Sequence, residues 1–259
     1  MLLEVKDLNI SLTSEKSVAE HISFRLGQGE MLSIVGSSGA GKTTICKAIM
    51  GLLGNTYRAD GEILFQGEDL LDLPERKRQT IYGKEICLIM QNPMTAFNPS
   101  IRVGRQMEKT YLLHHGKTPR QEMQRLFAAI LQKLGLEDTQ RILNSYPFTL
   151  SGGMLQRLID RAALMCQPAL LVADEATTAI DACNRIGLMR ELKSFCKDGM
   201  SVLFVTHDLR SASVSDRILV MDRGQIVEQG KTEQILNTPK EDYTKYLLNA
   251  CRLERREMS

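Results

Sequence analysis

The feature that most constrains this chain is an apolar run followed at once by a glycine-rich turn. Met31–Val35 is almost continuously apolar, which is typical of a strand buried on both faces of a parallel sheet. Residues 36–43 then read Gly-Ser-Ser-Gly-Ala-Gly-Lys-Thr, the spacing G-x-x-x-x-G-K-[ST]. Lys42–Leu53 continues with a helical pattern that we expect to end at Gly54. This order predicts an α/β fold with a phosphate-binding loop between strand and helix.

The residues of this loop suit a nucleoside triphosphate and its magnesium ion. Glycines let backbone N–H groups approach the phosphates, and the helix N-terminus adds its positive end. We expect Lys42 to reach the β- and γ-phosphate oxygens and the Thr43 hydroxyl to coordinate Mg²⁺. The candidate ATP-binding residues here are Gly36, Ser37, Ser38, Gly39, Ala40, Gly41, Lys42, Thr43 and Thr44.

A second apolar strand delivers two carboxylates further along the chain. Leu170–Ala173 is followed directly by Asp174 and Glu175. Asp174 suits a contact with Mg²⁺, and Glu175 is placed to polarise the attacking water. The pair therefore predicts ATP hydrolysis rather than ATP binding alone.

Strand and helix patterns alternate over much of the chain. Further strand candidates are residues 22–26, 61–65, 86–90, 201–205 and 217–221. Strands that alternate with helices predict a parallel sheet with helices on both faces. Residues 95–165 differ because they carry long helical patterns and few strand signals. We therefore expect a core interrupted by a mostly helical insert.

Composition narrows the class of partner. The 259 residues carry a formal net charge of +2 and contain no tryptophan, which argues against a nucleic-acid groove. No stretch of about 18 apolar residues is present, and the start lacks the pattern of a signal peptide. The six cysteines never fall at C-x-x-C spacing, which favours reduced thiols in a cytosolic protein. Any membrane role is thus expected to come through partners.

A second potential anion site lies at the start of another helix. Leu150, Ser151, Gly152 and Gly153 precede an apolar stripe that continues to Cys166. Ser151 is a natural N-cap, and the two glycines expose backbone N–H groups that bind anions. One chain has no need of two such helix ends, unless the second serves a nucleotide held by a partner.

With phosphate loop, Leu-Ser-Gly-Gly signature and Asp-Glu strand in this order, the chain resembles the ABC transporter ATPases over essentially its whole length. The resemblance implies a P-loop NTPase (RecA-like) core, an N-terminal antiparallel β subdomain and an inserted α-helical subdomain. It implies one ABC ATPase domain over residues 1–259. Residues 1–92 and 166–259 would form the catalytic core lobe, and residues 93–165 the helical signature subdomain.

The same resemblance assigns roles to further positions. Ser151, Gly152 and Gly153 would contact the γ-phosphate held by the phosphate loop of the partner subunit. Gln91, just after a strand, matches the glutamine that senses Mg²⁺, water and the membrane partner. His207, after the strand Val202–Val205, matches the switch histidine that can hydrogen-bond the γ-phosphate and orient water.

One more match lies at the expected dimer interface. Asp181 corresponds to the aspartate that crosses between the two ATPase subunits of ABC transporters. The implied partners are membrane permease subunits, a second ATPase subunit (a heterodimer is favoured) and, indirectly, an extracytoplasmic substrate-binding protein, with no nucleic acid. The implied location is peripheral, on the cytoplasmic face of the inner membrane.

Local motifs point to one branch of the family. Gln91–Pro99, Tyr146–Phe148 and the tail Pro239–Leu248 resemble the peptide/nickel importer branch. Peptide importers of that branch usually continue into a cysteine-bearing extension, whereas this chain stops soon after Cys251. It is most similar to the nickel-import and metallophore-import ATP-binding proteins. A dipeptide or oligopeptide importer remains the alternative, since the ATPase does not touch the cargo.

Three departures from the family pattern have expected consequences. Ser11–Val18 contains no aromatic residue to stack on adenine, so we expect loose selection of the base. Ala176 stands where relatives have proline, with a modest effect expected. Asp160 and Arg161 replace apolar residues; Asp160 could pair with Arg157, and charges without partners on a buried face would be costly.

Two other classes of protein share parts of this pattern. Soluble ABC ATPases of DNA repair carry a long coiled coil between the halves of the site, and those of translation carry two phosphate loops. This chain has one such loop and a short separation between Lys42 and Ser151. A P-loop kinase would leave the signature helix unexplained.

Overall fold

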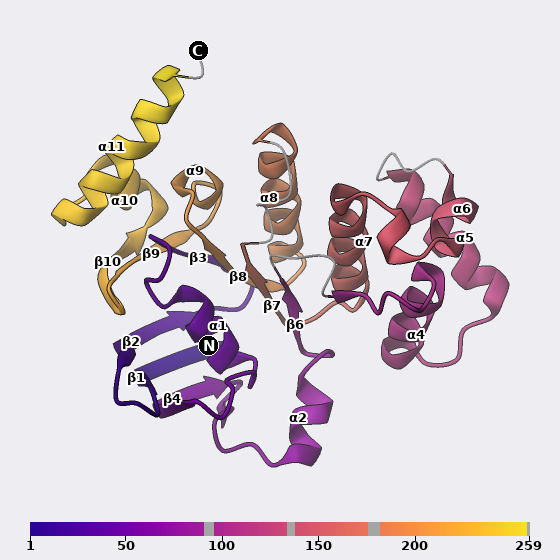
Figure 1. Cartoon of the computed structure of the whole chain (residues 1–259), viewed down its shortest axis with the longest axis horizontal. Coiled ribbons are helices and arrows are strands. Elements are labelled where there is room, and N and C mark those ends of the chain that lie inside the picture. The colour runs from indigo at the N-terminus through magenta and orange to yellow at the C-terminus, as the bar shows by residue number, and fades with distance from the viewer. Residues whose placement is uncertain (91–95, 134–137, 176–181, 258–259) are drawn as a thin grey trace.

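The computed structural model describes residues 1–90, 96–133, 138–175 and 182–257 as two sheets and an arm of helices (Figure 1). Sheet A has the strand order β2-β1-β4-β5 and is antiparallel. Sheet B has the order β10-β9-β3-β8-β7-β6. Its neighbouring strands are parallel except for the pair β9 and β10. The expected α/β fold, with an antiparallel sheet beside a mainly parallel core, is confirmed.

The strands of sheet A are β1 (Leu3–Leu12), β2 (Ser17–Leu26), β4 (Tyr57–Phe65) and β5 (Glu68–Asp69). Those of sheet B are β3 (Met31–Gly36), β6 (Ile86–Ile89), β7 (Leu170–Asp174), β8 (Ser201–Thr206), β9 (Arg217–Asp222) and β10 (Gln225–Lys231). The helices of the core are α1 (Lys42–Ile49), α2 (Glu75–Ile81), α8 (Ala182–Cys196), α9 (Leu209–Ala212), α10 (Thr232–Asn237) and α11 (Asp242–Glu257). Those of the arm are α4 (Val103–His115), α5 (Arg120–Lys133), α6 (Thr139–Asn144), the 3₁₀ turn η1 (Pro147–Thr149) and α7 (Gly152–Met165).

The central strands of sheet B are buried on both faces, as their sequences predict. On β7, Leu170 and Val172 face a core shared with α1 and sheet A, whereas Leu171 and Ala173 face a core shared with α7 and α8. All four side chains are fully buried. Successive side chains of a strand point to opposite faces, so an uninterrupted apolar strand is stable only between two layers. Burying a leucine or valine side chain contributes about 1.5–3 kcal/mol.

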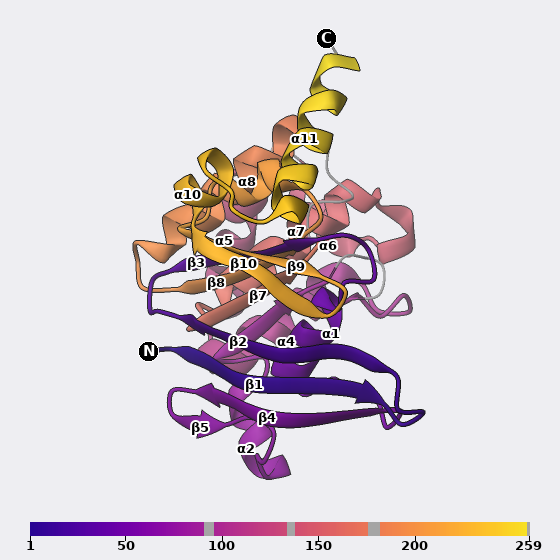
Figure 2. The same ribbon diagram turned by 90° about the vertical axis from the view of Figure 1, so that its left-hand side faces the viewer.

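Helix α1 lies between the two sheets (Figure 2) and is shorter than its sequence predicts. Ile45 and Ile49 are buried in the core that includes strands of sheet A. The helix ends at Ile49 rather than Leu53 because Gly51 takes a left-handed conformation with φ +63°. The Gly51 N–H donates to Ala48 O (3.0 Å), and the Leu52 N–H donates to Lys47 O (2.7 Å). This is a Schellman C-cap, so Gly51 rather than Gly54 ends the helix.

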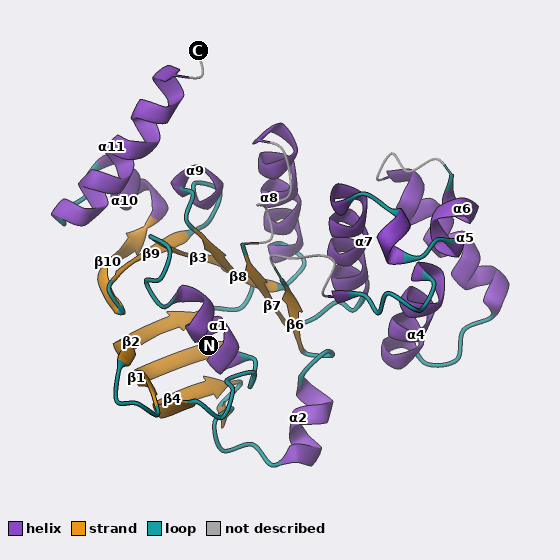
Figure 3. Ribbon diagram, in the orientation of Figure 1, coloured by secondary structure: helices purple, strands orange, loops and turns teal. Residues whose placement is uncertain are grey.

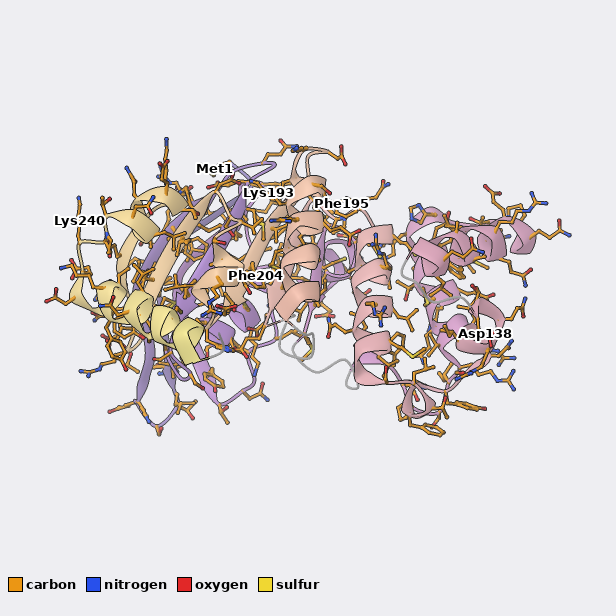
Figure 4. All side chains as sticks on the ribbon, turned by 90° about the horizontal axis from the view of Figure 1, so that it is seen from above. Met1, Asp138, Lys193, Phe195, Phe204 and Lys240 are labelled. Atoms are coloured by element: carbon orange, nitrogen blue, oxygen red, sulfur yellow. The ribbon has the colours of Figure 1, made fainter. Side chains whose placement is uncertain are left out.

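The arm, defined as α4 to α7 with η1, stands to one side of the sheets. Between residues 96 and 165 the described residues form helices and no strand (Figure 3). Seen from above, this region, which includes Asp138 at the N-cap of α6, projects away from the sheets (Figure 4). Phe127 of α5 and Leu155 of α7 belong to the same buried cluster as Leu171 of β7, which joins the arm to sheet B. No helix in the described ranges combines the length and apolar character needed to cross a bilayer.

Candidate functional site

Three segments meet at one edge of sheet B. The phosphate loop follows β3, Asp174 and Glu175 end β7, and His207 follows β8. These strands are adjacent in the order β3-β8-β7, with Val35 opposite Thr206 and Asp174 opposite Val205. Because the carboxyl ends of parallel strands share one edge, residues far apart in sequence gather there.

Two glycines of the phosphate loop are required by the structure. A Cβ atom at Gly36 would lie 2.2 Å from the Met221 carbonyl oxygen, which no side chain tolerates. Gly41 has φ +94° and forms the N-cap of α1, and a Cβ there would lie 2.8 Å from Val18 O. Between them, residues 37–39 are exposed and Ala40 is buried. The loop therefore presents its middle to solvent while its ends are held by sheet B and by the start of β2.

Lys42 lies under the loop. Its Nζ atom donates to Gly36 O and to Ser37 O, both at 2.8 Å, and the side chain is 4% exposed. Burial lowers the pKa of this ammonium, and the nearby carboxylates of Glu175 and Asp174 oppose that shift. A buried ammonium is costly without partners, so an anion that joins the site gains a strong and pre-positioned donor.

Thr43 and Asp174 form a pair of oxygen ligands suited to a small hard cation. Thr43 Oγ1 donates to Asp174 Oδ1 at 3.2 Å. Burial raises the pKa of the Asp174 carboxyl, while the Thr43 hydrogen bond and Lys42 lower it. A hydroxyl and a carboxylate beside a phosphate-binding loop match the donor set that holds Mg²⁺ with phosphates. Thr44, the next residue of α1, is half-buried.

Glu175 and His207 face each other across neighbouring strands. Glu175 Oε1 lies 3.3 Å from His207 Nδ1. The Glu175 N–H donates to Val205 O at 2.8 Å, which fixes its backbone to β8. Its φ of +47° is a left-handed conformation that costs energy for a residue with a side chain. Asp208 follows His207 and caps α9 by accepting the Arg210 N–H at 2.9 Å.

The signature residues lie on the arm, apart from this edge. Ser151 caps α7 as its sequence predicts, because its Oγ accepts the Met154 N–H at 3.3 Å. A Cβ atom at Gly152 or Gly153 would meet nothing within 4 Å, so this helix end is open. Helix α7 packs on one face of sheet B and α1 on the other (Figure 1). The structure thus does not bring Ser151 to the phosphate loop of its own chain.

Charged residues of α7 find partners within the described residues. Arg161 forms an ion pair with Glu191 of α8, and the two side chains are 20% and 32% exposed. Arg157 Nε donates to Gly153 O at 3.2 Å. The expected cost of an unpaired Arg161 is therefore avoided. The expected pairing of Asp160 lies outside what is described, because its side chain is not among the described ones.

Three residues expected at the site lie outside the described ranges. These are Gln91, Ala176 and Asp181. The five cysteines whose side chains the structure describes are free thiols.

The site also contains a residue that sequence reasoning missed. Tyr243 of α11 accepts the Ser37 N–H at its hydroxyl oxygen, at 3.1 Å. The two residues are 206 positions apart. No local sequence pattern indicates such a contact. The available hint is that the Tyr243 side chain carries a hydroxyl on a helix face that is otherwise apolar.

Comparison with known proteins agrees with this geometry. The family model described as ABC transporter matches residues 19–178, more than half of the chain. The chain belongs to the ABC transporter family. Like the family's other ATP-binding cassettes, it is an ATPase.

Two solved ABC structures share the fold. The "ATP binding subunit of ABC transporter" has a TM-score of 0.77 at 25% identity, covering 97% of this chain and 100% of the other. The ATP-binding cassette MJ0796, solved as a dimer in a post-hydrolysis state with ADP and Pi, has a TM-score of 0.78 at 26% identity, covering 89% and 99%. That cassette binds its nucleotide product as a dimer.

Similar ABC proteins are named as ATP-binding proteins of import or transport systems. The metal-staphylopine import system ATP-binding protein CntD of Staphylococcus aureus is 39% identical over 96% of this chain and 92% of its own length. The oligopeptide transport ATP-binding protein OppD of Bacillus subtilis is 41% identical over 95% and 71%. The dipeptide transport ATP-binding protein DppD of Haemophilus influenzae is 38% identical over 96% and 77%.

Proposed function

We propose that this ABC ATPase powers a membrane importer by closing on ATP with a second nucleotide-binding subunit. One observation carries the proposal: Lys42 begins α1 and Ser151 caps α7, and these two helices lie on opposite faces of sheet B. Two anion-binding helix ends that cannot meet within one chain can meet between two chains. The dimeric form of the similar MJ0796 cassette supports this arrangement.

Each described residue of the edge then has a role. Gly36 to Thr44 enclose the phosphates, and Lys42 moves from the loop carbonyls to the β- and γ-phosphate oxygens. Thr43 and Asp174 hold Mg²⁺, which neutralises phosphate charge when bound. Glu175 accepts the proton of the attacking water, and His207 orients Glu175 and that water.

Further residues complete the site from outside the described edge. Ser151, Gly152 and Gly153 donate backbone N–H groups to the γ-phosphate held by the partner subunit. Gln91 contacts Mg²⁺ and water and couples the nucleotide site to the permease. Asp181 crosses the dimer interface.

The cargo we propose is a metal chelate, with nickel as the metal. The match to CntD supports this choice because it extends over nearly the full length of both chains. Among nickel importers, the ATP-binding protein NikD is the member that the sequence motifs resemble. A peptide importer is the second candidate, supported by the 41% identity to OppD.

The proposed assembly follows from this choice. The chain binds permease subunits at the cytoplasmic face of the inner membrane, and a different ATPase subunit completes its dimer. A substrate-binding protein outside the membrane delivers the chelate to the permease. No nucleic acid is involved, which agrees with the net charge of +2.

Transport assays in a strain that lacks this gene test the proposal. Wild-type protein should restore uptake of radioactive nickel presented with a chelator, and Glu175→Gln should not. Restored uptake of a labelled dipeptide instead would replace the metal cargo by a peptide. Membrane subunits should co-purify with the chain after extraction in mild detergent. If no membrane subunit co-purifies, and the wild-type gene leaves uptake of both cargos at the level of the deletion strain, the importer function is refuted.

A further inference from the structure

The C-terminal helix α11 contacts the phosphate loop at its first peptide. Tyr243 lies in the first turn of α11, and its Oη atom accepts the Ser37 N–H at 3.1 Å. The tyrosine ring packs against a buried cluster that contains Val35, the residue just before the loop. The hydroxyl is therefore positioned by packing of the ring rather than by the hydrogen bond alone.

The contact holds a peptide unit that a second side chain also holds. The peptide between Gly36 and Ser37 offers its N–H to Tyr243 and its carbonyl oxygen to Lys42 Nζ, the latter at 2.8 Å. A peptide unit is planar, so its N–H and C=O groups rotate together. Tyr243 and Lys42 thus fix the orientation of one rigid plane from its two sides.

These two contacts differ in what ATP does to them. Lys42 is the residue that turns toward phosphate oxygens, so the Gly36 carbonyl then loses its ammonium donor. Tyr243 lies on α11, outside the residues that enclose the phosphates, so ATP does not compete for its hydrogen bond to Ser37. We therefore expect Tyr243 to hold this peptide in place both with and without bound ATP.

We propose that Tyr243 is a positioning residue of the phosphate loop, which couples the C-terminal helix to nucleotide affinity. The inference rests on the proposed role of residues 36–44 in ATP binding. Holding the first peptide lowers the conformational freedom that the loop loses when it encloses phosphates, so the hydroxyl strengthens binding through preorganisation.

A second contact places α11 independently of Tyr243. Arg210 Nη2 donates to the Cys251 carbonyl oxygen at 2.6 Å. Arg210 belongs to α9, which begins two residues after His207. Helix α11 is therefore tied both to the loop after β3 and to the helix after β8, and it lies over β9 and β10 (Figure 2). Its register against the loop does not depend on the tyrosine hydroxyl.

The test removes the hydroxyl and keeps the ring. For Tyr243→Phe in the full-length chain, we expect titration calorimetry to show roughly two- to tenfold weaker binding of a non-hydrolysable ATP analogue, the loss of one ordinary hydrogen bond. KM for ATP should rise by a similar factor while kcat stays within about twofold. The Ser37 amide should exchange its hydrogen faster, and the melting temperature should not change.

Tyr246 provides the matched control on the same helix. The centroids of the Tyr246 and Tyr243 rings lie 6.5 Å apart, and Tyr246 is 66% exposed. Tyr246→Phe should leave analogue affinity and amide exchange at wild-type values. Equal affinity of wild type and Tyr243→Phe would overturn the inference, as would an equal loss in Tyr246→Phe. A wild-type chain that binds no ATP analogue would instead refute the proposed function itself.

Discussion

Glu175 Oε1 and His207 Nδ1 lie 3.3 Å apart, at the ends of the adjacent strands β7 and β8. Glu175 keeps this position although its φ of +47° is unfavourable. Strain of this kind persists where the surrounding structure holds it, and it occurs at catalytic sites more than elsewhere. The pair is therefore the part of the site where substitution should affect hydrolysis and spare binding.

Replacing Glu175 by Gln should abolish most hydrolysis. The amide cannot accept a proton from water, so we expect kcat to fall on the order of 10²–10⁴-fold with ATP affinity maintained. The protein, purified with its partner subunits, should remain in a closed, ATP-loaded dimer, detected by cross-linking or light scattering. Glu233→Gln, at an exposed position in the first turn of α10, is the control and should behave as wild type. Wild-type turnover in Glu175→Gln would show that another group activates the water.

Gly152→Ala tests the contact across the dimer. A Cβ there meets nothing within 4 Å in this chain, so folding and ATP binding to the phosphate loop should be unchanged. If the helix end closes on the partner's γ-phosphate, the added methyl group should reduce hydrolysis by the assembled transporter on the order of 10- to 100-fold.

Gly187→Ala provides a matched control for that experiment. Gly187 is also helical, exposed and free of atoms within 4 Å of an added Cβ. Calorimetric ATP binding and steady-state hydrolysis should stay at wild-type values for this variant, and its melting temperature should not fall. Full hydrolysis by Gly152→Ala would place the signature helix away from the nucleotide.

Base selection should be weak. The start of β2 adjoins the phosphate loop, since Val18 O lies 2.8 Å from a Cβ built at Gly41, and the segment Ser11–Val18 carries no aromatic ring. Without stacking worth about 0.5–1.5 kcal/mol, ATP and GTP should bind with affinities less than about tenfold apart. Titration calorimetry with both nucleotides measures the ratio; a tenfold or larger preference for ATP would contradict the expectation.

His21 should titrate above the ordinary histidine value. Its Nδ1 atom lies 2.7 Å from Asp7 Oδ1, and this hydrogen bond, together with the charge of Asp7, raises its pKa from 6.5. A raised pKa in the folded state adds stability that is complete below about pH 6.5 and is lost as the pH rises through the folded value. Both side chains are mostly exposed, so the gain should be small and screened by salt.

NMR titration of the His21 ring measures that shift directly. Asp7→Asn should return the pKa toward 6.5 and lower the melting temperature more at about pH 5.5 than at about pH 8. An unchanged pKa in Asp7→Asn would assign the shift to another neighbour.

The spacing of apolar residues along the sequence predicted the strands whose side chains are buried on one face or on both faces of a sheet. Met31–Val35 could be identified because every position of β3 is buried, and a short uninterrupted apolar run that ends at a glycine is typical of such a strand. Glycine spacing predicted the loop because Gly36 and Gly41 are positions where a Cβ would collide with backbone. The Ser151 cap was predictable because capping is local in sequence.

Polar strands and distant contacts escaped prediction for a physical reason. β4 begins at Tyr57, before the expected Gly61, because its first residues pair with β1 while largely exposed and so carry no apolar signal. β10 is an edge strand with a mostly polar sequence and was likewise missed. The Tyr243–Ser37 hydrogen bond depends on where α11 packs, which local pattern does not encode.

The hydrogen bonding of β7 to β8 also determines which part of the molecule is rigid. Glu175 is bonded to Val205 O, and strand spacing of about 4.8 Å, rather than any loop, sets its reach to the neighbouring histidine. The separation of Glu175 and His207 is therefore fixed by the pairing of the two strands that precede them. If the chain closes with a second subunit as proposed, we expect the rearrangement to take place in the arm next to Ser151 rather than at Glu175 and His207.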